Sequence, residues 1–91
     1  MKVKNVNGSS RWKAPKGYES WLDYWCCQKG LTVDCFALDC DGNAEAGGHV
    51  VKVNSQDKSV YIIPLCKKCN NRTDAFEVTA SMLVPVPSRL D

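Results

Sequence analysis

Cys35-x4-Cys40 and Cys66-Lys-Lys-Cys69 are the two stretches of this chain that decide its fold. Four thiolates that two tight turns bring together make a closed tetrahedral zinc site. The second pair stands at the start of a predicted helix, where the helix dipole lowers the thiol pKa and favours metal binding. We therefore expect one structural Zn²⁺ ion, bound by Cys35, Cys40, Cys66 and Cys69.

Two further cysteines, Cys26 and Cys27, lie on another predicted helix. Adjacent residues on a helix point about 100° apart, so both thiols do not easily join one site. We exclude both from the zinc ligands. One is expected to pack as a small buried hydrophobic residue, and the other to play no part in the site.

The six cysteines also bear on the compartment. The sequence begins without an apolar stretch of the kind that signal peptides carry, and no run approaches the ~20 apolar residues of a membrane span. We therefore expect a cytoplasmic protein without membrane association. Thiols stay reduced in the cytosol, where cysteines are more often metal ligands than disulfides.

The length of 91 residues leaves room for one domain with a small core, for which a metal ion is a plausible source of stability. The formal net charge of +2 is too small to indicate a nucleic-acid-binding protein by itself. The basic residues that precede the first acidic residue, Glu19, are Lys2, Lys4, Arg11, Lys13 and Lys16. We expect a basic flexible arm over residues 1–16 and a single zinc-stapled domain over residues 17–91. The arm is either a solvated terminus or a phosphate-contacting tail.

The spacing of apolar residues predicts the secondary structure. Residues 18–28 carry aromatic and leucine side chains at three- and four-residue steps, which is typical of a helix. The tryptophans of this helix could stack on nucleobases, but such a stripe more often belongs to the core, and we expect core. The other expected elements are strands over 44–53 and 59–65, a short helix from Cys66 to about Phe76, and an edge strand or extended cover over 78–86.

The middle of the sequence resembles a known family. The motifs stand in the order Cys35-x4-Cys40, Gly47-Gly-His49-Val and Tyr61-Ile-Ile-Pro-Leu-Cys66-x2-Cys69-Asn70. This order resembles the treble-clef, zinc-bound branch of the HNH (ββα-metal) nucleases, over residues 35–76. The resemblance implies a small α+β fold: a zinc-bound treble clef of zinc knuckle, β-hairpin and helix, with an additional N-terminal helix. It also implies that His49 faces the second helix near Asn70.

The resemblance implies roles for two residues. His49 matches the general base of the family, which takes a proton from the water that attacks a phosphodiester. Asn70 matches the helix ligand of a catalytic divalent cation such as Mg²⁺ or Mn²⁺. Gly48 stands where the family has a metal ligand, and Tyr61 falls near the position where an asparagine orients the histidine. Mg²⁺ usually needs at least one carboxylate, which Asp74 could supply. Apart from the family, a lone histidine on a strand is also compatible with a bond to a backbone carbonyl or with a fourth zinc ligand.

The motifs are compatible with three functions. The first is a small zinc-binding HNH-like module that binds nucleic acid without efficient catalysis. The second is an active HNH endonuclease that uses a divalent cation and His49 as its base. The third is an adaptor for a protein partner, in which zinc only organises the surface. The basic residues expected to contact phosphates are Lys13, Lys16, Lys67, Lys68 and Arg72. They favour the first function, and the glycine before His49 weighs against the second.

Overall fold

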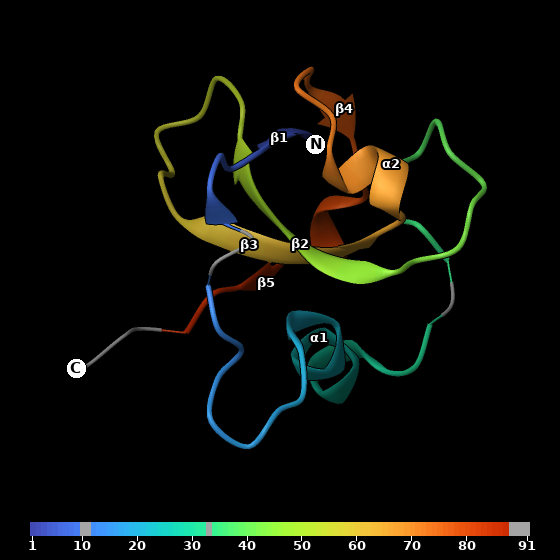
Figure 1. Cartoon of the computed structure of the whole chain (residues 1–91). Coiled ribbons are helices and arrows are strands. Elements are labelled where there is room, and N and C mark those ends of the chain that lie inside the picture. The colour runs from blue at the N-terminus through green and yellow to red at the C-terminus, as the bar shows by residue number, and fades with distance from the viewer. Residues whose placement is uncertain (10–11, 33, 88–91) are drawn as a thin grey trace.

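An antiparallel sheet organises the chain (Figure 1). The computed structural model describes residues 1–9, 12–32 and 34–87, so Arg11 of the expected arm and residues 88–91 of the expected domain lie outside the described part. Within it, five strands stand in the order β4-β1-β2-β3-β5. The elements are β1 (Lys2–Asn5), α1 (Trp21–Lys29), β2 (Ala46–Lys52), β3 (Val60–Leu65), α2 (Lys67–Asn70), β4 (Phe76–Glu77), the 3₁₀ turn η2 (Ala80–Met82) and β5 (Val84–Pro85). This is a small α+β fold, the class that the sequence predicts.

β2 and β3 form the central hairpin, which confirms the two strands expected over residues 44–53 and 59–65. Their register pairs His49 with Ile62. Successive residues of a strand point to opposite faces of the sheet, and Ile62 and Ile63 are both fully buried. Both faces of the hairpin are therefore covered, and the sheet lies at the centre of the molecule.

The first residues of the chain form β1 rather than a flexible arm. Val3 is fully buried between the neighbouring strands β2 and β4. Lys2 and Lys4 are exposed, so β1 alternates outward lysines with an inward valine, the pattern of a half-buried strand. The prediction of an arm over residues 1–16 was therefore wrong for residues 2–5. It was based on the number of basic residues and not on the alternation of lysine and valine.

Both helices are shorter than expected. α1 begins only at Trp21 because Ser20 caps it, with a side-chain oxygen that accepts a hydrogen bond from the backbone N–H of Asp23. α2 is a single turn that stops before Asn71, and Phe76, the expected end of this helix, pairs in β4 instead. Among the described residues, no helix has the length and apolar character needed to cross a membrane.

The two helices cover opposite faces of the sheet (Figure 1). A Cβ atom on Gly47 would lie 2.7 Å from the backbone N of Leu22 in α1, whereas one on Gly48 would lie 2.9 Å from the side chain of Asn70 in α2. Trp25 of α1 is buried against β3 and β5, so the expectation of a core position is confirmed for this tryptophan. The α2 face carries the larger core cluster, which includes both cysteine pairs.

Candidate metal centre and the cleft beside it

The two cysteine pairs meet on the α2 face of the sheet. The Sγ atoms of Cys35, Cys40, Cys66 and Cys69 all lie within 4.8 Å of one another, and three of the four residues are buried. Sulfur atoms at ~2.3 Å from one tetrahedral zinc ion lie ~3.8 Å apart, and the Sγ atoms of Cys40 and Cys66 are 3.9 Å apart. The four cysteines that the sequence predicts as ligands could therefore hold one metal ion.

The loop before β2 shapes the first half of this cysteine cluster. The backbone N–H of Cys40 donates to the carbonyl of Ala37 over 3.0 Å, and that of Gly42 donates to the Cys40 sulfur over 3.3 Å. The N–H of Cys35 donates to the carbonyl of Gly42 over 2.9 Å and closes the loop. These bonds explain how a spacing of four residues between cysteines still brings both thiols to one point.

The first turn of α2 presents the second half of the cluster. The N–H of Cys69 donates to the sulfur of Cys66 over 3.4 Å, and this bond lowers the pKa of the Cys66 thiol. Burial has the opposite effect on two other cysteines of the cluster, because it raises the pKa of Cys35 and raises that of Cys69 to about 12. Thiols buried in this way stay protonated unless a bound cation compensates their charge. Burial therefore disfavours free thiolates at Cys35 and Cys69.

The cluster is also closed. Four sulfur atoms would complete a tetrahedral shell around one ion and would leave no position for a substrate, as in structural rather than catalytic zinc sites. Cys26 and Cys27 lie on α1, against the other face of the sheet, and are not among the cysteines that meet here in the described residues. The metal that fits this site would support the fold and would not act on a substrate directly.

His49 lies on the α1 face of β2. Its ring is flanked edge-on by Trp12, at 4.9 Å between ring centroids, and by Trp21, at 4.7 Å, and the residue is only 5% exposed. The expectation that His49 faces α2 was wrong, because side chains alternate along a strand: Gly47 and His49 point towards α1, and Gly48 points towards α2. The sheet separates His49 from the cysteine cluster, so the structure does not place it as a fourth metal ligand.

Gly48 and Asn70 meet on the α2 face of β2. A Cβ atom on Gly48 would lie 2.5 Å from Cδ1 of Leu65 and 2.9 Å from Oδ1 of Asn70, so a carboxylate there would have to displace the ends of both side chains. Asn70 approaches from the α2 face, and His49 lies on the opposite face. The hydroxyl of Tyr61 is bound by a carboxylate of the β2–β3 turn, and it therefore does not orient His49.

Four of the five basic residues expected to contact phosphates are exposed: Lys13, Lys16, Lys67 and Lys68. The fifth, Arg72, is bound within the chain. It donates to Asp74 over 2.7 Å and to Asp39 over 2.8 Å, which lowers the pKa of both carboxyl groups. Its guanidinium also lies 4.9 Å from the ring centre of Phe76. Arg72 supports the loops around the cysteine cluster, and Asp74 is engaged with it rather than turned to a divalent cation.

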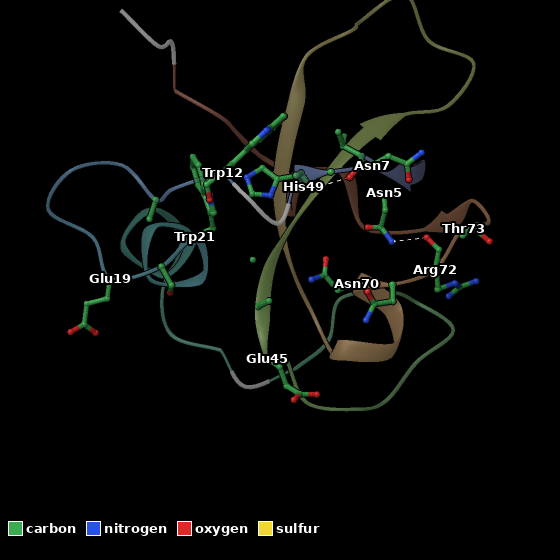
Figure 2. Close-up of a pocket in the computed structure, with 18 residues that line it drawn as sticks. Asn5, Asn7, Trp12, Glu19, Trp21, Glu45, His49, Asn70, Arg72 and Thr73 are labelled. Atoms are coloured by element: carbon green, nitrogen blue, oxygen red, sulfur yellow. Dashed lines mark hydrogen bonds between the residues drawn. The ribbon is translucent and has the colours of Figure 1, made fainter. Parts of the chain in front are cut away.

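A cleft of about 510 Å³ opens beside His49 (Figure 2). Its walls come from the loop after β1, the start of α1, the first half of β2 and the residues around the end of α2. Trp12 and Trp21 line one side of it. The amide side chains at its surface belong to Asn5, Asn7, Asn70 and Asn71. His49 and Asn70 therefore reach the same cavity, although they come from opposite faces of β2.

The sequence does not single out two residues of this region, Asn5 and Trp12. The Nδ2 atom of Asn5 donates to the carbonyls of Cys69, over 2.9 Å, and of Arg72, over 3.0 Å, and so links β1 to the turn that carries the second cysteine pair. The alternation of residues 2–5 is the signal that could have placed Asn5 on a strand. Nothing in the sequence marks Trp12, because it stands in a loop without periodicity.

We predict that His49 is neutral over the physiological pH range. Burial lowers its pKa from the ordinary 6.5 to about 4. The unfolded chain takes up this proton near pH 6.5 and the folded chain only near pH 4. The contribution of His49 to stability is therefore complete above pH 6.5 and is lost as the pH falls towards 4, by about 1.4 kcal/mol per pH unit. NMR titration of the imidazole measures the pKa, and the His49→Gln variant should lack this part of the pH dependence. An imidazole pKa above 6 would contradict the burial described here.

Comparisons of this chain with protein-family models, with curated proteins and with solved structures found no match. The geometry of the cysteine cluster and of the cleft is therefore the basis for a functional assignment.

Proposed function

We propose that the four cysteines bind one structural zinc ion, and that the knuckle, the β2–β3 hairpin and α2 form a treble clef around it. The observation that carries this proposal is the closed set of four sulfur atoms within 4.8 Å of one another. A tetrahedral set of thiolates suits zinc better than it suits magnesium, calcium or manganese, which prefer oxygen ligands. The order of knuckle, hairpin and helix supports the resemblance to the zinc-bound HNH proteins.

We further propose that this zinc module binds nucleic acid through the face that carries the cleft. The exposed lysines are close in the sequence to residues on both walls of it. Lys13 and Lys16 belong to the loop that presents Trp12, and Lys67 and Lys68 stand on α2, next to the asparagines of the opposite wall. Lysines in the segments that form two walls of a groove suit a ligand whose negative charge repeats along a chain, which is the property of a phosphate backbone.

Two glutamates line the same cleft and could oppose a phosphate chain. Figure 2 shows the carboxylate of Glu19 directed away from the cleft. The carboxylate of Glu45 accepts a hydrogen bond from the backbone N–H of Lys67 over 3.1 Å. Their negative charge therefore lies at the margins of the cleft, and the side chains around His49 are aromatic or amide groups.

Cleavage of nucleic acid is supported less well than binding. An HNH nuclease would need a divalent cation beside His49, and Gly48, at the position of one of its ligands, has no side chain to offer. A histidine with a pKa of about 4 is also a weak base at neutral pH. We expect no nicking of plasmid DNA by the zinc-loaded protein with Mg²⁺ or Mn²⁺. Nicking that chelators stop and that His49→Ala abolishes would establish the endonuclease instead.

The test of binding is the dependence of affinity on salt. The double variant Lys67→Ala, Lys68→Ala should bind a labelled oligonucleotide more weakly in fluorescence anisotropy. If both lysines contact phosphates, the slope of log K against log salt becomes shallower by about 1.8 for duplex DNA, since each phosphate contact contributes about 0.9. Lys58→Ala is the matched control, because Lys58 is also exposed but lies in the turn at the far end of the hairpin. No binding at ~50 mM salt to duplex DNA, single strands or RNA would favour the protein adaptor.

A further inference from the structure

The first half of β2 has an edge that no strand of the described sheet covers. The backbone N–H of Phe36 donates to the carbonyl of Pro64 over 2.9 Å, so the carbonyl of Pro64 points away from β2. Gly47 is the residue paired with Pro64. In an antiparallel ladder, when one member of a pair turns its backbone groups away from the partner strand, the other member does too. The N–H and C=O of Gly47 therefore point away from β3.

These groups point to the side of β2 on which β1 lies, but β1 ends at Asn5, which pairs with Val50, and does not extend as far as Gly47. The last rung between the two strands is the bond from the N–H of Val6 to the carbonyl of His49, over 2.9 Å. The carbonyl of Val6 accepts a hydrogen bond from the hydroxyl of Ser9 instead of from His49. The N–H of His49 and both backbone groups of Gly47 point away from β3 and have no hydrogen-bond partner among the described residues. Both residues line the cleft.

The side chains beside this open edge are uncharged aromatic and amide groups. Trp12 stands beside it, edge-on to His49, and is only partly buried. Asn70 lines the cleft from the opposite wall, and the Oδ1 atom of Asn5 is buried at the cleft without a partner among the described residues. The cleft thus offers backbone and amide donors and acceptors next to an indole ring. A nucleobase is the ligand that combines a flat apolar face with neighbouring donors and acceptors on one edge.

We propose that the cleft takes up one unstacked base of a single-stranded nucleic acid, with the base against Trp12 and its edge on the backbone of Gly47. This inference rests on the proposed binding of nucleic acid and names the form of the ligand. The volume of about 510 Å³ lies in the range of pockets that enclose small ligands. A base within a duplex is stacked on both faces and paired at its edge, so it cannot enter. The module should therefore prefer single strands to duplexes.

An extended peptide is the other ligand that an open strand edge can bind. Strand addition needs a row of rungs, whereas here only Gly47 offers both of its backbone groups. The exposed lysines that neighbour the wall residues in the sequence also match a chain of phosphates better than a neutral peptide. The observations favour the base.

The experiment compares labelled 10-mer single strands of DNA and RNA with a hairpin duplex, at one ionic strength, by fluorescence anisotropy with the zinc-loaded protein. We expect tighter binding of a single strand. Trp12→Ala should weaken this binding by about 5- to 150-fold, as for the loss of one stacked base, and should leave the salt dependence unchanged. Tyr18→Ala is the matched aromatic control, because Tyr18 packs on Tyr24 outside the cleft. Thermal melts establish that both variants are folded.

A second measurement does not depend on a variant. In ¹H–¹⁵N spectra, the amide signals of Gly47 and His49 should shift on addition of the 10-mer, and much less on addition of a strand whose bases are all replaced by abasic sites. Equal affinity for duplex and single strand, with no effect of Trp12→Ala, would overturn base insertion. In that outcome, binding that still depends on Lys67 and Lys68 would retain the proposed function. Absence of binding to every nucleic acid would contradict both the base insertion and the proposed function. A shift of the Gly47 amide signal on addition of an unstructured peptide would then indicate strand addition.

Discussion

Replacing Cys66 with serine should abolish metal binding and the folded state together. Cys66 supplies one of the four sulfur atoms, and its sulfur accepts the hydrogen bond from Cys69 that shapes the turn. The apparent binding free energy of a structural zinc ion is about 10–16 kcal/mol, as large as the whole stability of an ordinary domain, about 5–15 kcal/mol. Without the ion, the remaining thiols no longer link the loop before β2 to α2. We expect the variant to lack a cooperative thermal transition, and the wild-type protein to lose its own when a strong chelator removes the metal.

Cys27→Ser is the control for this experiment. Cys27 is exposed on α1, on the other side of the sheet from the cluster. This variant should keep one zinc ion per chain and the melting temperature of the wild type. A Cys66→Ser protein that melts cooperatively at the wild-type temperature would show that the metal does not hold the fold.

The second large effect is expected at Trp25. The Trp25 ring is 2% exposed and packs against Phe36, at 5.2 Å between ring centroids, and its Nε1–H donates to the carbonyl of Met82 over 2.8 Å. Trp25→Ala would leave a cavity between α1 and the sheet and would remove the donor of that carbonyl. Substitutions of this kind cost about 3–5 kcal/mol. Chemical denaturation of the zinc-loaded protein measures this loss.

Two variants calibrate the Trp25 experiment. Trp25→Phe should retain most of the packing and lose chiefly the hydrogen bond to Met82, at about 1 kcal/mol. Leu31→Ala should change the stability by less than about 0.5 kcal/mol, because Leu31 is 97% exposed. A Trp25→Ala protein that loses less than about 1 kcal/mol would mean that α1 does not pack on the sheet as described.

The sequence predicts the cysteine cluster and the central hairpin well, because both depend on local patterns. Cys66 and Cys69 are brought together by a single turn of chain, and Cys35 and Cys40 by a loop closed with backbone bonds. The hairpin follows from two β-prone runs of the right length. Neighbours in the sequence determine the geometry of each pair and of the hairpin, and the pairing of β2 with β3 then brings the two cysteine pairs together.

The parts that were mispredicted depend on contacts between distant segments. Val3 becomes part of the sheet because β2 and β4 flank it. The basic residues around it suggest an exposed segment when the sequence is taken alone. The face on which His49 lies depends on which glycine, Gly47 or Gly48, accommodates α1. The sequence does not distinguish the two glycines. Only the packed structure shows that Gly47 lies against the backbone of α1 and that Gly48 faces Leu65.

The central claim is that one zinc ion is held by the four cysteines alone. X-ray absorption spectroscopy at the zinc edge of the purified, zinc-loaded protein tests it most directly. The account predicts one zinc ion per chain and a first shell of four sulfur atoms at ~2.3 Å. A first shell with a nitrogen at ~2.0–2.1 Å, which only His49 among the side chains could supply as an imidazole, or with oxygen in place of sulfur, would contradict it.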